Sequence, residues 1–154
     1  MKIAGIISLM VTLFVILSGC KKEDSDNNAS MTSVHNETES HNNGEACMSC
    51  HNSGGSGEGS FNVAGSVYTE DLSTANANGT VYLYSGQNGT GTLVATIEVD
   101  GKGNFYTTAS VIPAAGVYAQ VKGASGNVKN MSQLFTSGNC NSCHGVGTAK
   151  IWVN

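Results

Sequence analysis

The chain has 154 residues, with 7 lysines and no arginine against 11 acidic residues, and its formal charge is −4 at pH 7. This balance excludes a nucleic-acid-binding protein, because such proteins need clustered cations to neutralise phosphates. The length that remains after the apolar N-terminal segment is enough for one ordinary domain.

Residues 1–19 are expected to be a signal peptide. Lys2 precedes an apolar run at residues 3–17 that is short for a permanent membrane span. The run ends in LSGC, which resembles the lipobox of bacterial lipoproteins. This resemblance implies cleavage before Cys20 and acylation of its thiol, and several acyl chains together attach a protein stably to a membrane. The alternative is a plain signal peptide, or a short anchor, with an incidental Cys20.

Residues 20–45 are predicted to form a flexible polar tether. They contain too little apolar surface to offset the entropy lost on ordering. Residues 21–28, KKEDSDNN, resemble the Lys-plus-acidic export signal of some bacterial surface lipoproteins. We therefore expect an outer-membrane lipoprotein, on its periplasmic or its cell-surface face, whose folded domain covers residues 46–154.

The second half of the chain has the pattern of short β-strands. Runs rich in Val, Thr, Tyr and Ile are separated by Gly, Asn and Asp, which are turn residues. This spacing predicts an all-β fold, a single sandwich of about seven strands. The expected strands cover residues 61–69, 80–85, 92–99, 104–110, 116–122, 131–136 and 148–153.

A family resemblance points to the same fold class. The segments GSVY, ANGTVYLYS, TIEVDGKGNFYT and AGVYAQVKG, within residues 61–122, resemble carboxypeptidase regulatory-like domains. These domains have an Ig-like or prealbumin-like sandwich fold, which the resemblance implies here. It implies little about function, because such domains are usually scaffolds.

Two Cys-x-x-Cys-His pentads stand at the edges of this domain, CMSCH at residues 47–51 and CNSCH at residues 140–144. Each matches the attachment motif of c-type haem, in which two thiols form thioethers with the porphyrin and the His binds the iron. The match implies two covalently bound haem c groups. The implied thioether residues are Cys47, Cys50, Cys140 and Cys143, and the implied proximal iron ligands are His51 and His144.

Zinc and disulfides are the chemical alternatives for these cysteines. Four Cys in two pairs also suit one structural zinc ion, and each pair could close as a disulfide in an oxidising compartment. Haem is favoured because it alone explains why a His follows the second Cys in both pentads.

The ligands on the other side of each iron come from a short list. Of the four His, His35 and His41 lie outside the pentads, so two bis-His haems would use all four. Otherwise these two are solvated linker residues. Met131 is the alternative ligand for the second haem, or else a core residue of a late strand.

These features predict an electron carrier and not an enzyme. Its partners would be redox proteins or neighbouring copies of itself, with extracellular electron transfer as one setting, and the lipid membrane through Cys20. The alternative is a zinc- or disulfide-stapled β-sandwich that acts as a surface binding or adhesion lipoprotein. If seven strands alternate in direction, both pentads lie at one end of the sandwich, which we expect; with six strands, without the one at 131–136, they would lie at opposite ends. The Gly-rich residues 51–60, HNSGGSGEGS, are expected to let the first haem loop adjust.

Overall fold

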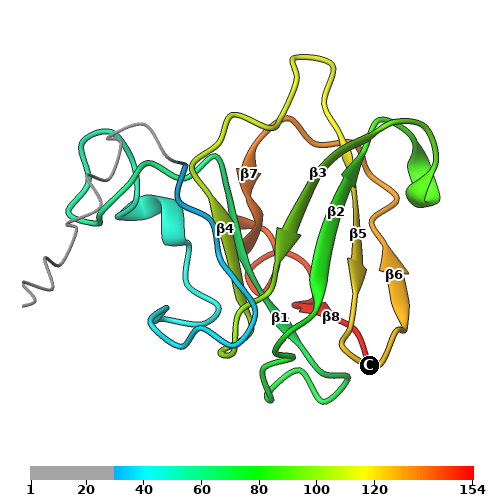
Figure 1. Ribbon diagram of the computed structural model, residues 1–154, viewed down its shortest axis with the longest axis horizontal. Helices are drawn as coiled ribbons and strands as arrows, with labels where there is room; N and C mark the ends of the chain where they lie inside the picture. The colour runs from blue at the N-terminus through cyan, green and yellow to red at the C-terminus, as the bar shows by residue number, and fades with distance from the viewer. Residues whose placement is uncertain (1–29) are drawn as a thin grey trace, which may run out of the picture.

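The computed structural model describes residues 30–154, which fold into two facing β-sheets (Figure 1). The predicted signal peptide, Cys20 and the first part of the predicted tether lie outside the described residues. Within residues 30–154, no helix has the length and apolar character that crossing a membrane requires. The all-β sandwich is confirmed, with eight strands where about seven were expected.

The first sheet is built around β1 (Val63–Tyr68). This strand pairs antiparallel with β4 (Asn104–Thr107) and parallel with two very short strands, β7 (Gly138–Asn139) and β8 (Ile151–Trp152). The chain therefore returns to β1 immediately before the second pentad and again shortly after it.

The second sheet is antiparallel, with the order β3-β2-β5-β6. Its strands are β2 (Thr80–Tyr84), β3 (Leu93–Glu98), β5 (Tyr118–Lys122) and β6 (Val128–Asn130). Alternate residues of β2 are buried, as a sheet with one covered face requires. A core of mainly β-branched side chains fills the space between the sheets. Its members are Val63, Val67, Val81, Leu83, Ile97, Val99, Phe105, Val117, Val121 and Val153.

The first five predicted strands are confirmed, whereas the two late ones are not placed as expected. Residues 131–136 do not form a strand. The Met131 N–H donates to the Ala119 carbonyl in β5, and Phe135 forms an isolated β-bridge with Val117. The last strand is shortened to β8 because Thr148 bonds back to the second pentad, where its N–H donates to the Cys143 carbonyl.

Residues 30–45 are not a free tether. Thr32 forms a β-bridge with Thr107 at the edge of β4, and Ser33 is buried (Figure 1, blue segment). Further along, the Gly101 N–H donates to the Glu37 carbonyl at 2.7 Å. The predicted flexible tether is therefore wrong for residues 30–45. A polar composition indicates that little apolar surface is buried, but this segment is docked mainly by hydrogen bonds.

Strand β1 is buried along its whole length. Val63 and Val67 face the core between the sheets, whereas Ala64, Ser66 and Tyr68 lie on the opposite face, which in a sandwich is normally exposed. These side chains are covered by the two pentads and their flanking residues. The first sheet therefore depends on both pentads for its outer cover.

Replacing Ser33 by Ala tests the docking of residues 30–45. The Ser33 hydroxyl donates to the Glu98 carbonyl at 2.5 Å and accepts from the Tyr106 N–H at 3.0 Å. Loss of both bonds should lower the free energy of unfolding by ~1–3 kcal/mol, measured by urea denaturation. Ser110→Ala, at an exposed position, is the matched control and should change it by less than ~0.5 kcal/mol. Equal effects of the two substitutions would contradict the docked segment.

Candidate functional site

The first pentad forms one tight turn, η1 (Cys47–Ser49). The Cys47 carbonyl accepts the N–H groups of Cys50 at 3.2 Å and of His51 at 3.0 Å. The His51 Nδ1 lies 2.7 Å from the Glu58 carbonyl oxygen. Because a carbonyl oxygen only accepts, Nδ1 must carry the proton, and the Nε2 lone pair of His51 is left for a metal.

The second pentad repeats this arrangement in η3 (Cys140–Ser142). The Cys140 carbonyl accepts the N–H groups of Cys143 at 3.2 Å and of His144 at 2.9 Å. The His144 Nδ1 lies 2.8 Å from the Ala149 carbonyl oxygen, which fixes the same tautomer with Nε2 as the lone-pair nitrogen.

The two turns agree in backbone detail although their surroundings differ. The residue before each turn has similar torsions, with φ −73° and ψ 83° at Ala46 and φ −79° and ψ 73° at Asn139. The first thiol of each pentad also approaches the carbonyl two residues earlier, at 3.5 Å for Cys47 and 3.4 Å for Cys140. The local sequence therefore builds the same structure twice.

Close packing fixes the ring of His51. It stacks on Phe61 with ring centroids 4.1 Å apart and planes 6° apart, and Phe61 stacks in turn on Tyr106. On the other side, a Cβ at Gly57 would lie 2.7 Å from His51 Nδ1. The glycines of this loop were expected to make it adjustable, but Gly55 and Gly57 instead permit close backbone approach, since a Cβ at Gly55 would overlap the Cys50 carbonyl.

A buried polar side chain joins the two pentads to β1. Asn141 is 3% exposed, and its Oδ1 accepts the N–H of Ser66 at 3.1 Å. Its Nδ2 donates to the Glu45 carbonyl, just before the first pentad, at 2.9 Å and to the Ser66 hydroxyl at 3.1 Å. The pentads lie side by side, as expected. They lie together because both are attached to β1. The strands do not simply alternate in direction, since β7 and β8 run parallel to β1.

The inner thiols of the two pentads are neighbours. Burial raises the pKa of the Cys140 thiol to about 12, and the nearby Cys47 adds to the shift. Burial also raises the pKa of Cys47. Cys50 and Cys143 are exposed, so each pentad has one thiol facing inward and one facing outward.

A cavity of about 480 Å³ lies beside the first pentad. Cys47, Cys50 and His51 line it together with two residues of the docked N-terminal segment, Met31 and His41. The His41 and His51 ring centroids are 5.9 Å apart. The carboxylates of Glu39, Glu45 and Glu58 also line this cavity.

A second cavity, of about 360 Å³, lies beside the second pentad and reaches between the sheets. Its lining is mainly apolar and includes core side chains such as Leu83 and Phe105. Cys140, Cys143, His144 and Met131 line the same cavity, as do Lys129 and Lys150. Each cavity is within the size range of small-molecule and cofactor sites.

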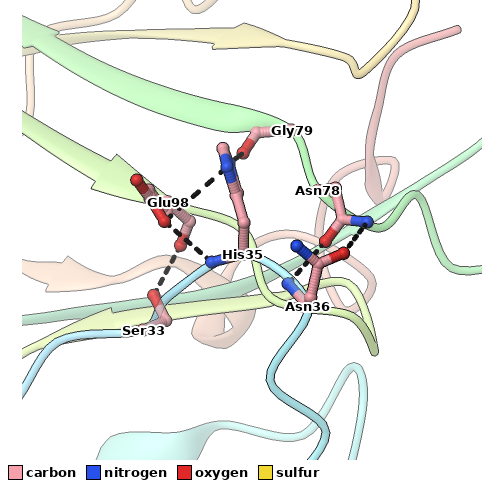
Figure 2. Close-up of polar contacts among 6 residues, drawn as sticks. All are labelled: Ser33, His35, Asn36, Asn78, Gly79 and Glu98. Atoms are coloured by element: carbon pink, nitrogen blue, oxygen red, sulfur yellow. Dashed lines mark hydrogen bonds and ion pairs between the residues drawn. The ribbon is translucent and has the colours of Figure 1, made fainter.

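His35 lines neither cavity, and its polar contacts are shown in Figure 2. Its Nε2 donates to the Gly79 carbonyl at 2.8 Å, and its Nδ1 lies 3.6 Å from a carboxylate oxygen of Glu98. The same carboxylate accepts the His35 backbone N–H at 2.7 Å. The Nε2–H and the backbone N–H of His35 therefore fasten residues 30–45 to the second sheet, and His35 is in the lining of neither cavity.

No protein-family model, curated protein or solved structure matches the chain. The carboxypeptidase regulatory-like resemblance therefore stays a prediction. Within residues 30–154, no group of three or more Cys, His, Asp or Glu side chains is placed to share one metal ion.

Sequence reasoning missed Asn141 and Ser66, because an Asn in a loop and a Ser in a strand are ordinary there. The available signal was the run Ala64-Gly65-Ser66, three small residues within a strand, which indicates close approach of another backbone. A Cβ at Gly65 would lie 2.6 Å from the Phe105 ring and 3.0 Å from the Cβ of Cys140, so the close neighbours of this glycine are side chains.

Replacing Asn141 by Ala should loosen both pentads. It removes the partners of the Ser66 N–H and the Glu45 carbonyl, so the free energy of unfolding should fall by ~1–3 kcal/mol in a urea titration. Asn127→Ala, on an exposed turn, should change it by less than ~0.5 kcal/mol. An Asn141→Ala protein as stable as the control would show that this side chain does not join the pentads.

Replacing Gly57 by Ala should displace the His51 ring, because the new Cβ would lie 2.7 Å from Nδ1. The expected result is a shift of the His51 ring nitrogen signals in NMR, with the His144 signals unchanged. Gly147→Ala is the matched control, since a Cβ there meets no atom within 4 Å. Unchanged His51 signals in Gly57→Ala would refute the packing described for this ring.

Proposed function

We propose that this protein is a dihaem c-type cytochrome that transfers electrons and is anchored to a membrane through acylated Cys20. One observation carries the proposal: in both pentads, the His donates its Nδ1–H to a backbone carbonyl and keeps Nε2 as a lone-pair nitrogen. Iron-ligating His residues are held in this way, which fixes the ring orientation and raises ligand basicity. Zinc bound by four thiolates or a pair of disulfides would have no use for either arrangement.

The surroundings of the pentads fit two haem groups. Each pentad lies beside its own cavity, and both Cys and the His of each pentad line it. Asn139, in the lining of the second cavity, has a buried Oδ1 without a hydrogen-bond partner in the described part of the chain. Two cations also line this cavity: the Lys129 Nζ lies over the Trp152 ring, and the Lys150 Nζ donates to the Leu72 carbonyl at 3.0 Å.

Each residue of a pentad has a defined task in this proposal. The two Cys hold the porphyrin edge covalently, the His binds iron, and the backbone carbonyl of Glu58 or Ala149 keeps the His in its tautomer. Bound haem supplies the redox chemistry, in which iron alternates between Fe(III) and Fe(II). Because no bond is made in a substrate, the sandwich only has to hold geometry.

The exposed position of Cys50 and Cys143 supports electron exchange at the protein surface. Partners of this kind are redox proteins or further copies of the chain. The lipobox at Cys20 and the acidic residues that follow support an outer-membrane location, on the periplasmic or the cell-surface face.

Intact mass and a pyridine haemochrome spectrum test the proposal on protein produced with haem-maturation machinery. The full-length protein should carry two haems. Cys47→Ala with Cys50→Ala should leave one, as should Cys140→Ala with Cys143→Ala, because each pentad attaches its haem separately. A protein that folds without a Soret band would refute the cytochrome assignment.

A further inference from the structure

We infer that the two haem sites are electronically unequal: the first, with His51 and His41 as axial ligands, has the lower reduction potential, and the second, with His144 and Met131, has the higher. This inference rests on the proposed function and adds a direction to it, since electrons then pass from the first site to the second. Axial ligand, local charge and burial set haem potentials, and all three differ between the sites in the same sense.

The axial ligand of the first site comes from the docked N-terminal segment. The His41 and His51 ring centroids are 5.9 Å apart, and two imidazoles on one metal place their centroids about 6 Å apart, given metal–nitrogen bonds of about 2.0 Å. Met31 lines the same cavity, with its sulfur next to Gly59, where an added Cβ would lie 2.8 Å from it. Within residues 30–154, the His41 ring has no hydrogen-bond partner that would have to be released.

The axial ligand of the second site is a thioether. Met131 follows β6 directly, and its N–H donates to the Ala119 carbonyl at 2.9 Å, which fixes its backbone on β5. It is half-buried and lines the same cavity as His144. No other Met and no second His line this cavity in the described part of the chain. A His/Met pair raises the potential of a haem relative to a bis-His pair.

Charge and burial reinforce the ligand difference. The first cavity is lined by Glu39, Glu45 and Glu58 and by no cation, which stabilises the more positive ferric state. The second is lined by no acidic residue, and the Lys129 Nζ lies over the ring of Trp152, which also lines the cavity, so this positive charge favours the ferrous state. Its apolar core lining also disfavours the extra positive charge of ferric iron.

Redox titration of the dihaem protein and of the two single-haem double-Cys variants tests the order of potentials. The variant that keeps only the second pentad should be reduced at the higher potential, and the variant that keeps only the first at the lower one. Equal potentials, or the reverse order, would overturn the inference.

Ligand variants test the assignment independently, by spectra of the ferric protein. Met131→Leu should abolish the weak red absorption of iron–thioether ligation and lower the potential of the second site alone. His41→Ala should convert the first haem from low spin to high spin. The matched controls, Met31→Leu and His35→Ala, should leave both signals unchanged. If both haems are attached but His41→Ala and Met131→Leu leave the spectra unchanged, the ligand assignment is wrong and the proposed cytochrome function is unaffected. If no haem is attached, the ligand assignment and the proposed function are both wrong.

Discussion

The structure depends on the cover of one face of β1. On this face the Ser66 hydroxyl accepts the Gly44 N–H at 2.9 Å, and Asn141 bonds both Ser66 and the Glu45 carbonyl. Removing either pentad would expose that face and leave buried polar groups without partners, which is costly. The residues that carry the proposed cofactors therefore also complete the sandwich, so attachment sites and fold cannot vary independently.

Much of this arrangement can be predicted from the sequence, and the predictions that proved wrong have physical causes. Runs rich in β-branched and aromatic residues between turn residues predicted the first five strands, and alternation is clear in β2, which has one covered face. The strand predicted at residues 131–136 does not form, because the backbone there makes only isolated hydrogen bonds to its neighbours and no continuous ladder. Residues 30–45 were predicted to be a flexible tether because their polar composition indicates little apolar burial. Hydrogen bonds instead dock this segment, from Ser33 and His35 to β3, β4 and the start of β2. The role of Asn141 could not be predicted, since it needs two segments that meet only in the fold.

The docked segment changes how the two sites compare. It brings His41, Glu39 and Glu45 to the first pentad, while the second pentad lies beside a cavity that reaches between the sheets. One motif with one backbone geometry is thus set in two environments, one polar and near the surface and one apolar. In the proposed cytochrome, this asymmetry lets a single small domain accept and pass on electrons in a preferred direction without any moving part.

The central claim is that each pentad holds its own iron through the lone-pair nitrogen of its His, on a shared base at β1. Anomalous diffraction at the iron absorption edge, on crystals of the mature protein made with haem-maturation machinery, measures this most directly. The account predicts two iron peaks, one bonded to Nε2 of His51 and one to Nε2 of His144, both beside β1. A single peak, iron away from these nitrogens, or a zinc signal among the four thiols would contradict it.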